Sequence, residues 1–152
     1  MTITPKEKEL VAIGISVASG CKPCTDHHVT VAQKARATGV EMREAVVDSL
    51  LIRHRAADIM EAHALDRLDE ERTPVTLGSR STSNRMEAMI SVGAAFAVNC
   101  TSSLEHSLAT AKAAGVSQDE IMQIVELAAF IKRKAASHVE RLVGMTEEET
   151  AA

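Results

Sequence analysis

The chain has 152 residues, of which 45% are apolar, and a formal net charge of -4. This length suits one domain with a sizeable core, or two small similar halves. No apolar run is long and uncharged enough for a transmembrane helix, and the acidic balance gives no reason to expect nucleic-acid binding. Residues 1–8 lack the apolar core of a secretory signal, so we expect a cytoplasmic protein with no membrane partner.

The chain is poor in the residues that favour strands. Aromatic residues make up 1% of it, with two Phe, no Trp and no Tyr, whereas strands are enriched in aromatic and β-branched residues. The sequence is instead rich in Ala, Leu, Met, Glu and Arg, which are good helix formers. The composition therefore predicts an all-α fold.

Three helices are predicted in the first half. The first begins at Thr4-Pro5-Lys6-Glu7, a capping-box pattern with proline at the first helical position, and ends at Gly20. The second opens directly afterwards, where Pro23 is tolerated in the first turn, and Gly39 is its expected C-terminal stop. A third, longer helical pattern runs from about Glu41 to about Leu68.

One polar stretch divides the chain. Residues 70–84 contain Pro74 and Gly78 and are predicted to be a linker. We therefore expect a single all-α domain over 1–152, with a first repeat at 4–69 and a second at 85–143.

The helical pattern begins again after the linker. Helices are predicted over Met86–Val98 and Cys100–Ala114, with a stop at Gly115. A further capping box, Ser117-Gln118-Asp119-Glu120, opens a long last helix. From Gly144 onward we expect a short acidic tail.

Short letter patterns recur between the halves. Ile15-Ser16-Val17 recurs as Ile90-Ser91-Val92, Cys24-Thr25 as Cys100-Thr101, and Ala37-Thr38-Gly39-Val40 as Ala113-Ala114-Gly115-Val116. Because order and spacing agree as well as composition, the pattern favours a divergent duplication of a three-helix unit. The alternative is a chance resemblance between Ala-rich helices that end in Gly-Val.

The segment Cys21–His28 concentrates two thiols and two imidazoles in eight residues. On a helix, Cys21, Cys24 and His28 would share one face. Cysteines three residues apart on a helical turn are close enough for a disulfide, and a histidine one turn further can exchange a proton. In a reducing compartment a CxxC pair is more often catalytic or metal-binding than structural, so the segment predicts thiol redox chemistry.

One motif of the first half consists of Glu9, eleven further residues, and then Cys21-x-x-Cys24-x-x-x-His28. This motif resembles the signature of the AhpD-like alkylhydroperoxidases, which belong to the wider carboxymuconolactone decarboxylase family. The second half is similar to the same unit at Asn99-Cys100, Ala111, Gly115-Val116 and Glu120-Ile121. The resemblance covers most of residues 6–142. It implies an all-helical unit that assembles into a homo-oligomer, a trimer or a hexamer.

The resemblance also implies a role for each motif residue. Cys24 would attack a hydroperoxide, Cys21 would resolve the product as a disulfide, and His28 and Glu9 would form a proton relay. A dithiol reductant, such as a lipoyl or thioredoxin-like protein, would reopen the disulfide. No cofactor is expected.

The sequence departs from the family pattern in two places. The interval from His28 to Gly39 is about one helical turn longer than usual. In the second half, if Cys100 takes the first cysteine position, Ser103 stands at the second and Ser107 at the histidine. We therefore expect one active site per chain, in the first half.

The expected chemistry depends on thiolate formation, since a free cysteine has a pKa of about 8.5. A helix N-terminus, the adjacent Lys22 and the base His28 would all favour the thiolate. His27 is either a bystander or a group that supports the site.

Two alternatives stay open, a non-catalytic protein and a different enzyme. The non-catalytic protein would be a helical assembly or a zinc-binding module. Cys21, Cys24 and His28 could bind zinc with His27, His54 or His63 as a fourth ligand, although no second Cys/His cluster is evident. A carboxymuconolactone decarboxylase-like enzyme is the other, and it would not need the cysteines. Four histidines are expected at the surface: His54, His63, His106 and His138. Cys100 is expected to be a buried, unreactive thiol.

Overall fold

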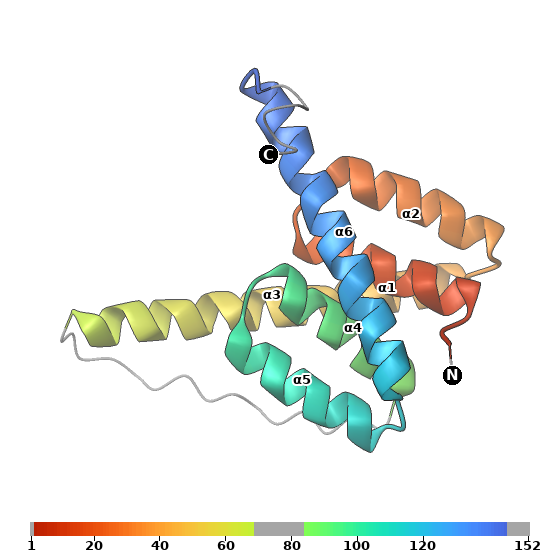
Figure 1. The fold of residues 1–152 in the computed structure, drawn as a ribbon, viewed down its shortest axis with the longest axis horizontal. Helices are drawn as coiled ribbons and strands as arrows, with labels where there is room; N and C mark the ends of the chain where they lie inside the picture. Colours follow the sequence, from red (N-terminus) through yellow and green to blue (C-terminus); the bar gives the residue numbers. More distant parts are fainter. Residues whose placement is uncertain (1, 69–83, 146–152) are drawn as a thin grey trace.

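The computed structural model describes residues 2–68 and 84–145, and within these ranges it contains six α-helices and no strand (Figure 1). The helices are α1 (Pro5–Ala18), α2 (Lys22–Lys34), α3 (Gly39–Arg67), α4 (Arg85–Ala97), α5 (Thr101–Ala113) and α6 (Gln118–Leu142). The predicted all-α fold is confirmed. Except for Asn84, the predicted linker lies outside the described residues, as does the predicted tail beyond Met145.

The helix starts follow local capping chemistry. Both predicted capping boxes, at Thr4 and Ser117, are present, so the starts of α1 and α6 are as expected. A third box at Thr38 opens α3 at Gly39, so the prediction that Gly39 ends the second helix is wrong. The left-handed residue that follows α2 is instead Arg36, with a φ of 66°.

The turn that follows His28 is therefore at Arg36 and not at Gly39, because Arg36 is the left-handed residue after α2. Arg36 is eight residues after His28, just as the left-handed Gly115 is eight residues after Ser107. Measured to equivalent turns, the two intervals are equal.

The core is built around α1 and α4, which contact each other and are covered by the remaining helices. Residues 9–16 of α1 are all buried, and so are residues 88–95 of α4 apart from the half-buried Ser91. In this arrangement α2 lies against α1, α5 lies against α4, and α3 and α6 pack on both central helices. Helices α1, α2 and α6 therefore contact one another, so side chains from all three can contribute to one site (Figure 1).

Two glycines allow α1 and α4 to approach closely. A Cβ atom added at Gly14 would lie 2.8 Å from Cγ2 of Ile90. One added at Gly93 would lie 2.8 Å from Cγ1 of Ile15. Since real Cβ atoms do not approach other atoms so closely, the packing of the central pair depends on both glycines.

Residues 79 positions apart occupy equivalent places in the two halves. Cys21 and Cys100, for example, are the N-caps of α2 and α5. Three further pairs have the same offset. Arg36 and Gly115 are the left-handed residues after these helices, and Thr38 and Ser117 are the N-caps of α3 and α6. Arg53 and Lys132 are the cations that bind the C-terminal carbonyls of α1 and α4. These equivalences support the duplication, which remains a hypothesis.

The structural register differs from the one that the repeated letters suggested. The Ile-Ser-Val and Cys-Thr matches imply offsets of 75 and 76 residues between the two halves. The N-caps and turns align instead at 79 residues, which pairs Cys21 with Cys100, and Cys24 with Ser103.

An ion pair between the half-buried Arg85 and the buried Glu120 joins α4 to the start of α6. Arg85 donates from Nη2 to Oε1 of Glu120 at 2.6 Å and also binds Glu7 of α1. The Arg85 hydrogen bonds, together with the backbone amide of Ser117, lower the pKa of Glu120 from 4.5 to about 2. The equivalent pair in the first half, Lys6 with Glu41, is more exposed.

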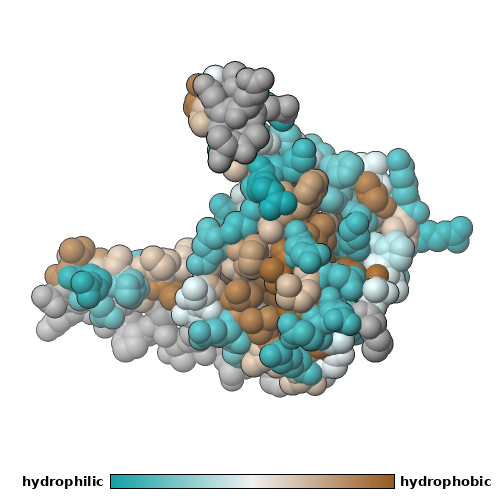
Figure 2. All heavy atoms as spheres, viewed as in Figure 1, coloured by the Kyte–Doolittle hydropathy of each residue, from teal (hydrophilic) through white to brown (hydrophobic). Residues whose placement is uncertain are grey.

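Parts of α3 and α6 extend beyond the packed body (Figure 1). Several large apolar side chains on these two helices are exposed: Val47, Leu51 and Met60 on α3, and Met122, Phe130 and Val139 on α6. Figure 2 shows apolar side chains gathered near the middle of the face that α6 crosses. Among the described residues, no helix combines the length and apolar character needed to cross a membrane.

Candidate active site

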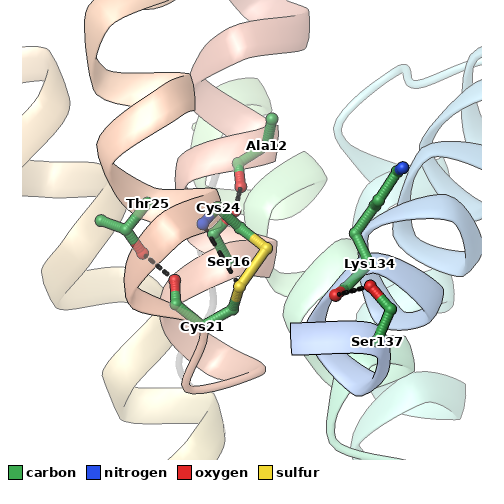
Figure 3. The surroundings of a disulfide bond; sticks show 7 residues. All are labelled: Ala12, Ser16, Cys21, Cys24, Thr25, Lys134 and Ser137. Atoms are coloured by element: carbon green, nitrogen blue, oxygen red, sulfur yellow. Dashed lines mark hydrogen bonds between the residues drawn. A yellow bond between two sulfur atoms is a disulfide. The ribbon is translucent and has the colours of Figure 1, made fainter. Parts of the chain in front are cut away.

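Cys21 and Cys24 form a disulfide at the N-terminus of α2 (Figure 3). The turn from α1 to α2 passes through Gly20, whose φ of 71° is left-handed and suits glycine. The Cys21 amide then donates to Ser16 O, and the Cys21 side chain caps α2 by accepting from Cys24 N at 3.2 Å. Pro23 lies in the first turn, as predicted, where its missing N–H costs nothing.

The disulfide lies in a confined place beneath α6. The two Cα atoms are 5.3 Å apart, and each cysteine is only 6% exposed. Figure 3 shows Ser16 of α1 behind the bond and Ser137 of α6 on the opposite side. The first half therefore supplies both cysteines, while the last helix of the chain supplies one wall of their surroundings.

The predicted relay residues Glu9 and His28 are in direct contact. His28 Nδ1 lies 2.8 Å from Oε2 of Glu9, and the two side chains are 12% and 11% exposed. A carboxylate at Nδ1 favours the tautomer that carries the proton there, which leaves Nε2 free to accept another proton. His28 is also four residues after Cys24 on α2, so both side chains emerge on the same face of the helix.

Glu9 and His28 line a pocket of about 580 Å³ between α1, α2 and α6. The other side of this pocket includes Gln123 and Phe130 of α6. His27 is exposed and lines the same pocket, with its ring centroid 4.9 Å from that of His28 in an edge-to-face arrangement. A small molecule could thus approach the Glu9–His28 pair from this side.

The prediction that His138 is a surface residue is wrong. This residue of α6 is half-buried, and its ring nitrogen and the sulfurs of Cys21 and Cys24 all lie within 4.8 Å of one another. It lines a second pocket, of about 590 Å³, together with Cys21 and Lys22. No local pattern near His138 signals this contact, because it arises only when α6 packs over the start of α2.

The zinc ligand set considered from the sequence is not assembled. Within the described parts of the chain, the one group of three or more Cys, His, Asp or Glu donors inside 4.8 Å of one another is Cys21, Cys24 and His138. The candidate fourth ligands His54 and His63 are exposed on α3. The exposure of these two residues and of His106 is as predicted.

The second half lacks this set of groups. Cys100 is buried at 7% exposure, as expected, and donates its thiol proton to Oγ of Ser103 at 3.2 Å. Ser107, which is also buried, is equivalent to His28, and Ala88 stands 79 residues after Glu9. The second half thus keeps the cap geometry and one thiol but has neither a second thiol nor a base.

A comparison with sequence models of protein families matches residues 2–57 to the Carboxymuconolactone decarboxylase family. The matched region spans α1, α2 and the first part of α3, and so includes both cysteines, His28 and Glu9. Comparisons with curated proteins and with solved structures gave no significant match. The helical unit at residues 2–57 is therefore similar to the carboxymuconolactone decarboxylase family.

Proposed function

We propose that this protein is a thiol-dependent oxidoreductase that reduces hydroperoxides with the Cys21–Cys24 pair. The observation that carries the proposal is the near-buried Glu9–His28 pair one helical turn from Cys24, beside cysteines close enough to be bonded. A structural disulfide would need no such base, whereas a thiol that attacks peroxide does. The family match supports an enzyme but leaves the reaction open.

The proposed cycle begins with both cysteines reduced. His28 takes the proton of Cys24, and the thiolate attacks the terminal oxygen of the hydroperoxide. The O–O bond breaks, the alkoxide takes the proton from His28 and leaves as an alcohol, and Cys24 becomes a sulfenic acid. Glu9 stabilises the imidazolium that exists between these steps.

Cys21 completes the oxidation. Its sulfur attacks the sulfur of the Cys24 sulfenic acid, the S–S bond forms, and hydroxide leaves with the Cys21 proton as water. The balance is one hydroperoxide and two thiols converted to one alcohol, one water and one disulfide. Two electrons from a dithiol reductant, of the lipoyl or thioredoxin-like kind, restore the thiols.

We also propose that the protein works as a homo-oligomer, a trimer or a hexamer, as the resemblance implies. The exposed apolar side chains on α3 and α6, among them Leu51, Met60 and Phe130, support this proposal. Light scattering of the purified protein across a range of concentrations measures the oligomeric state directly.

The proposed reaction is tested by titrating thiols before and after one equivalent of an organic hydroperoxide. We expect the fully reduced protein to fall from three titratable thiols to one under denaturing conditions, because Cys100 is left over. Cys100→Ser is the matched control, and its thiols should fall from two to none. If three thiols remain while a small-molecule thiol is oxidised, the proposal is wrong.

The matched family also includes decarboxylases, so an enzyme acting on a cyclic carboxylate is a second candidate. That chemistry does not depend on a CxxC pair. The double variant Cys21→Ser, Cys24→Ser separates the two candidates, since a lactone decarboxylase activity should survive it and hydroperoxide reduction should not.

A further inference from the structure

Two pockets flank the start of α2, and only one of them is lined by a cysteine of the disulfide. Glu9 and His28 line one pocket, while Cys21 lines the other together with His138. His138 belongs to α6 and lies outside residues 2–57, which match the family. Its ring nitrogen is within 4.8 Å of both sulfurs, so a second imidazole lies beside the redox pair.

We propose that the pocket beside Cys21 is where an external thiol reductant binds, and that His138 is the base that takes the proton of the incoming thiol. This inference rests on the proposed function, because it describes how the oxidised Cys21–Cys24 pair is returned to thiols. It assigns separate bases to the two half-reactions: His28 serves oxidation of Cys24, and His138 serves reduction at Cys21.

The lining of the pocket indicates the kind of thiol that fits. One wall is aliphatic, formed by Ala97, Ala135, Ala136, Val139 and Leu142. The charged groups among the lining residues are cationic, namely Lys22 of α2 and Lys132 of α6, of which Lys132 also binds the carbonyl of Phe96 and the side chain of Asn99. Cations favour the thiolate of an attacking thiol. The pocket therefore suits a thiol carried on a short apolar stem, preferably a dithiol.

The reduction balances with a dithiol as the only co-reactant. His138 takes the proton of the first thiol, whose sulfur attacks Sγ of Cys21. The Cys21–Cys24 bond breaks, and Cys24 leaves as a thiolate that takes a proton from the His28 side or from solvent. The second thiol releases its proton to solvent and attacks the first thiol's sulfur in the mixed disulfide, Cys21 leaves as a thiolate, and His138 returns its proton to Cys21. One dithiol becomes a disulfide and both cysteines become thiols.

The first experiment measures the rate at which dithiothreitol reduces the oxidised protein, with a chelator present so that metal cannot occupy the three donors. We expect His138→Asn to slow reduction at pH 7 by about tenfold or more, since a positioned base contributes at least this much to proton transfer. The exposed His106 of α5 supplies the matched control, and His106→Asn should leave the rate unchanged.

The pH profile separates a base from a residue that only shapes the pocket. The titratable groups around His138 are the two cysteines, which do not titrate while bonded, Lys22 of α2 and Lys132 of α6. Above its pKa, the attacking thiol is already deprotonated and needs no base. The difference in reduction rate between His138→Asn and the unmodified protein should therefore disappear at high pH. The proposal would be overturned if His138→Asn is reduced at an unchanged rate at pH 7, or if its rate is lowered by the same factor at every pH.

The second experiment locates the sulfur that exchanges with external thiols. Cys24→Ser leaves Cys21 as the accessible partner, and Cys21→Ser leaves Cys24. We expect a disulfide probe such as dithiodipyridine to react about tenfold faster with Cys24→Ser, and His138→Asn to slow only that reaction. Faster reaction of Cys21→Ser would contradict the assignment. Because neither experiment uses hydroperoxide, both outcomes stand even if the protein reduces no peroxide.

Discussion

The carboxylate of Glu9 and the imidazole of His28 meet across the contact between α1 and α2, with Oε2 2.8 Å from Nδ1. The Glu9 side chain is only 11% exposed. A carboxylate so far from solvent needs a partner that can carry positive charge. The pair therefore constrains His28 to one tautomer, with the proton on Nδ1, so that Nε2 is the nitrogen that can accept a proton.

Removing the charge of Glu9 should impair the reaction more than the fold. We expect Glu9→Gln to slow disulfide formation by hydroperoxide roughly ten- to hundredfold, because the imidazolium loses its counter-ion while the shape of the side chain is kept. Stopped-flow measurement of thiol loss gives the rate. Glu126→Gln is the matched control, since Glu126 lines the same pocket and is exposed. Equal rates for Glu9→Gln and the unmodified protein would contradict the relay.

The close crossing of α1 and α4 predicts a stability effect. Gly14→Ala and Gly93→Ala should each lower the free energy of unfolding by about 1–3 kcal/mol, because the added methyl group overpacks a full core. At Gly39 an added Cβ meets nothing within 4 Å, so Gly39→Ala should be neutral or slightly stabilising. Urea denaturation followed by circular dichroism measures all three. Similar stabilities for the three variants would show that the crossing is not tightly packed.

The Arg85–Glu120 pair predicts how stability depends on pH. The pKa of Glu120 is about 2 in the folded chain and 4.5 as its ordinary value, so the pair stabilises the fold fully above pH 4.5. That contribution is lost as the pH falls from 4.5 toward 2. Arg85→Met should lower the free energy of unfolding at pH 7 by about 1–3 kcal/mol, because the buried carboxylate loses its partner.

The matching variant in the first half is Lys6→Met, which removes the partner of Glu41. That pair is more exposed, so the loss should be below about 1 kcal/mol. Denaturation midpoints at pH 7 and pH 3 provide the comparison, and the gap between Arg85→Met and the unmodified protein should narrow at the lower pH. A gap that widens would contradict the assigned direction of the Glu120 pKa.

The register of the two halves can be tested by restoring a cysteine. In Ser103→Cys, the new sulfur would replace an Oγ that lies 3.2 Å from the Cys100 sulfur, in the cap geometry that Cys21 and Cys24 use. We expect diamide to form a second disulfide, so that no thiol remains titratable. Hydroperoxide should form it slowly, because Ala88 and Ser107 supply no relay. Failure of diamide to oxidise the pair would contradict the equivalence.

Much of the fold could be predicted because its signals are local. The capping boxes at Thr4 and Ser117, and the left-handed turn at Gly20, are fixed by a few neighbouring residues. The end of α2 could not be predicted in the same way. Arginine takes the left-handed position there without a glycine to mark it, and Gly39 resembles a stop although it begins α3.

In the candidate site, too, some residues are marked by the local sequence and one is not. Glu9, Cys21, Cys24 and His28 are recognisable because their spacing within α1 and α2 is itself the signal. His138 is more than a hundred residues away in the sequence, and only the packing of α6 brings it to the sulfurs. Its flanking residues give it the pattern of an exposed helix face, so no reading of that helix alone could have placed it beside the cysteines.

The most direct test of the account is peptide mapping by mass spectrometry of the reduced protein after one equivalent of hydroperoxide. We expect a single new bond to form rapidly between Cys21 and Cys24, with Cys100 still carrying a free thiol. Addition of a dithiol should then return the protein to three free thiols. Persistence of free Cys21 and Cys24, or oxidation that falls equally on Cys100, would contradict the account.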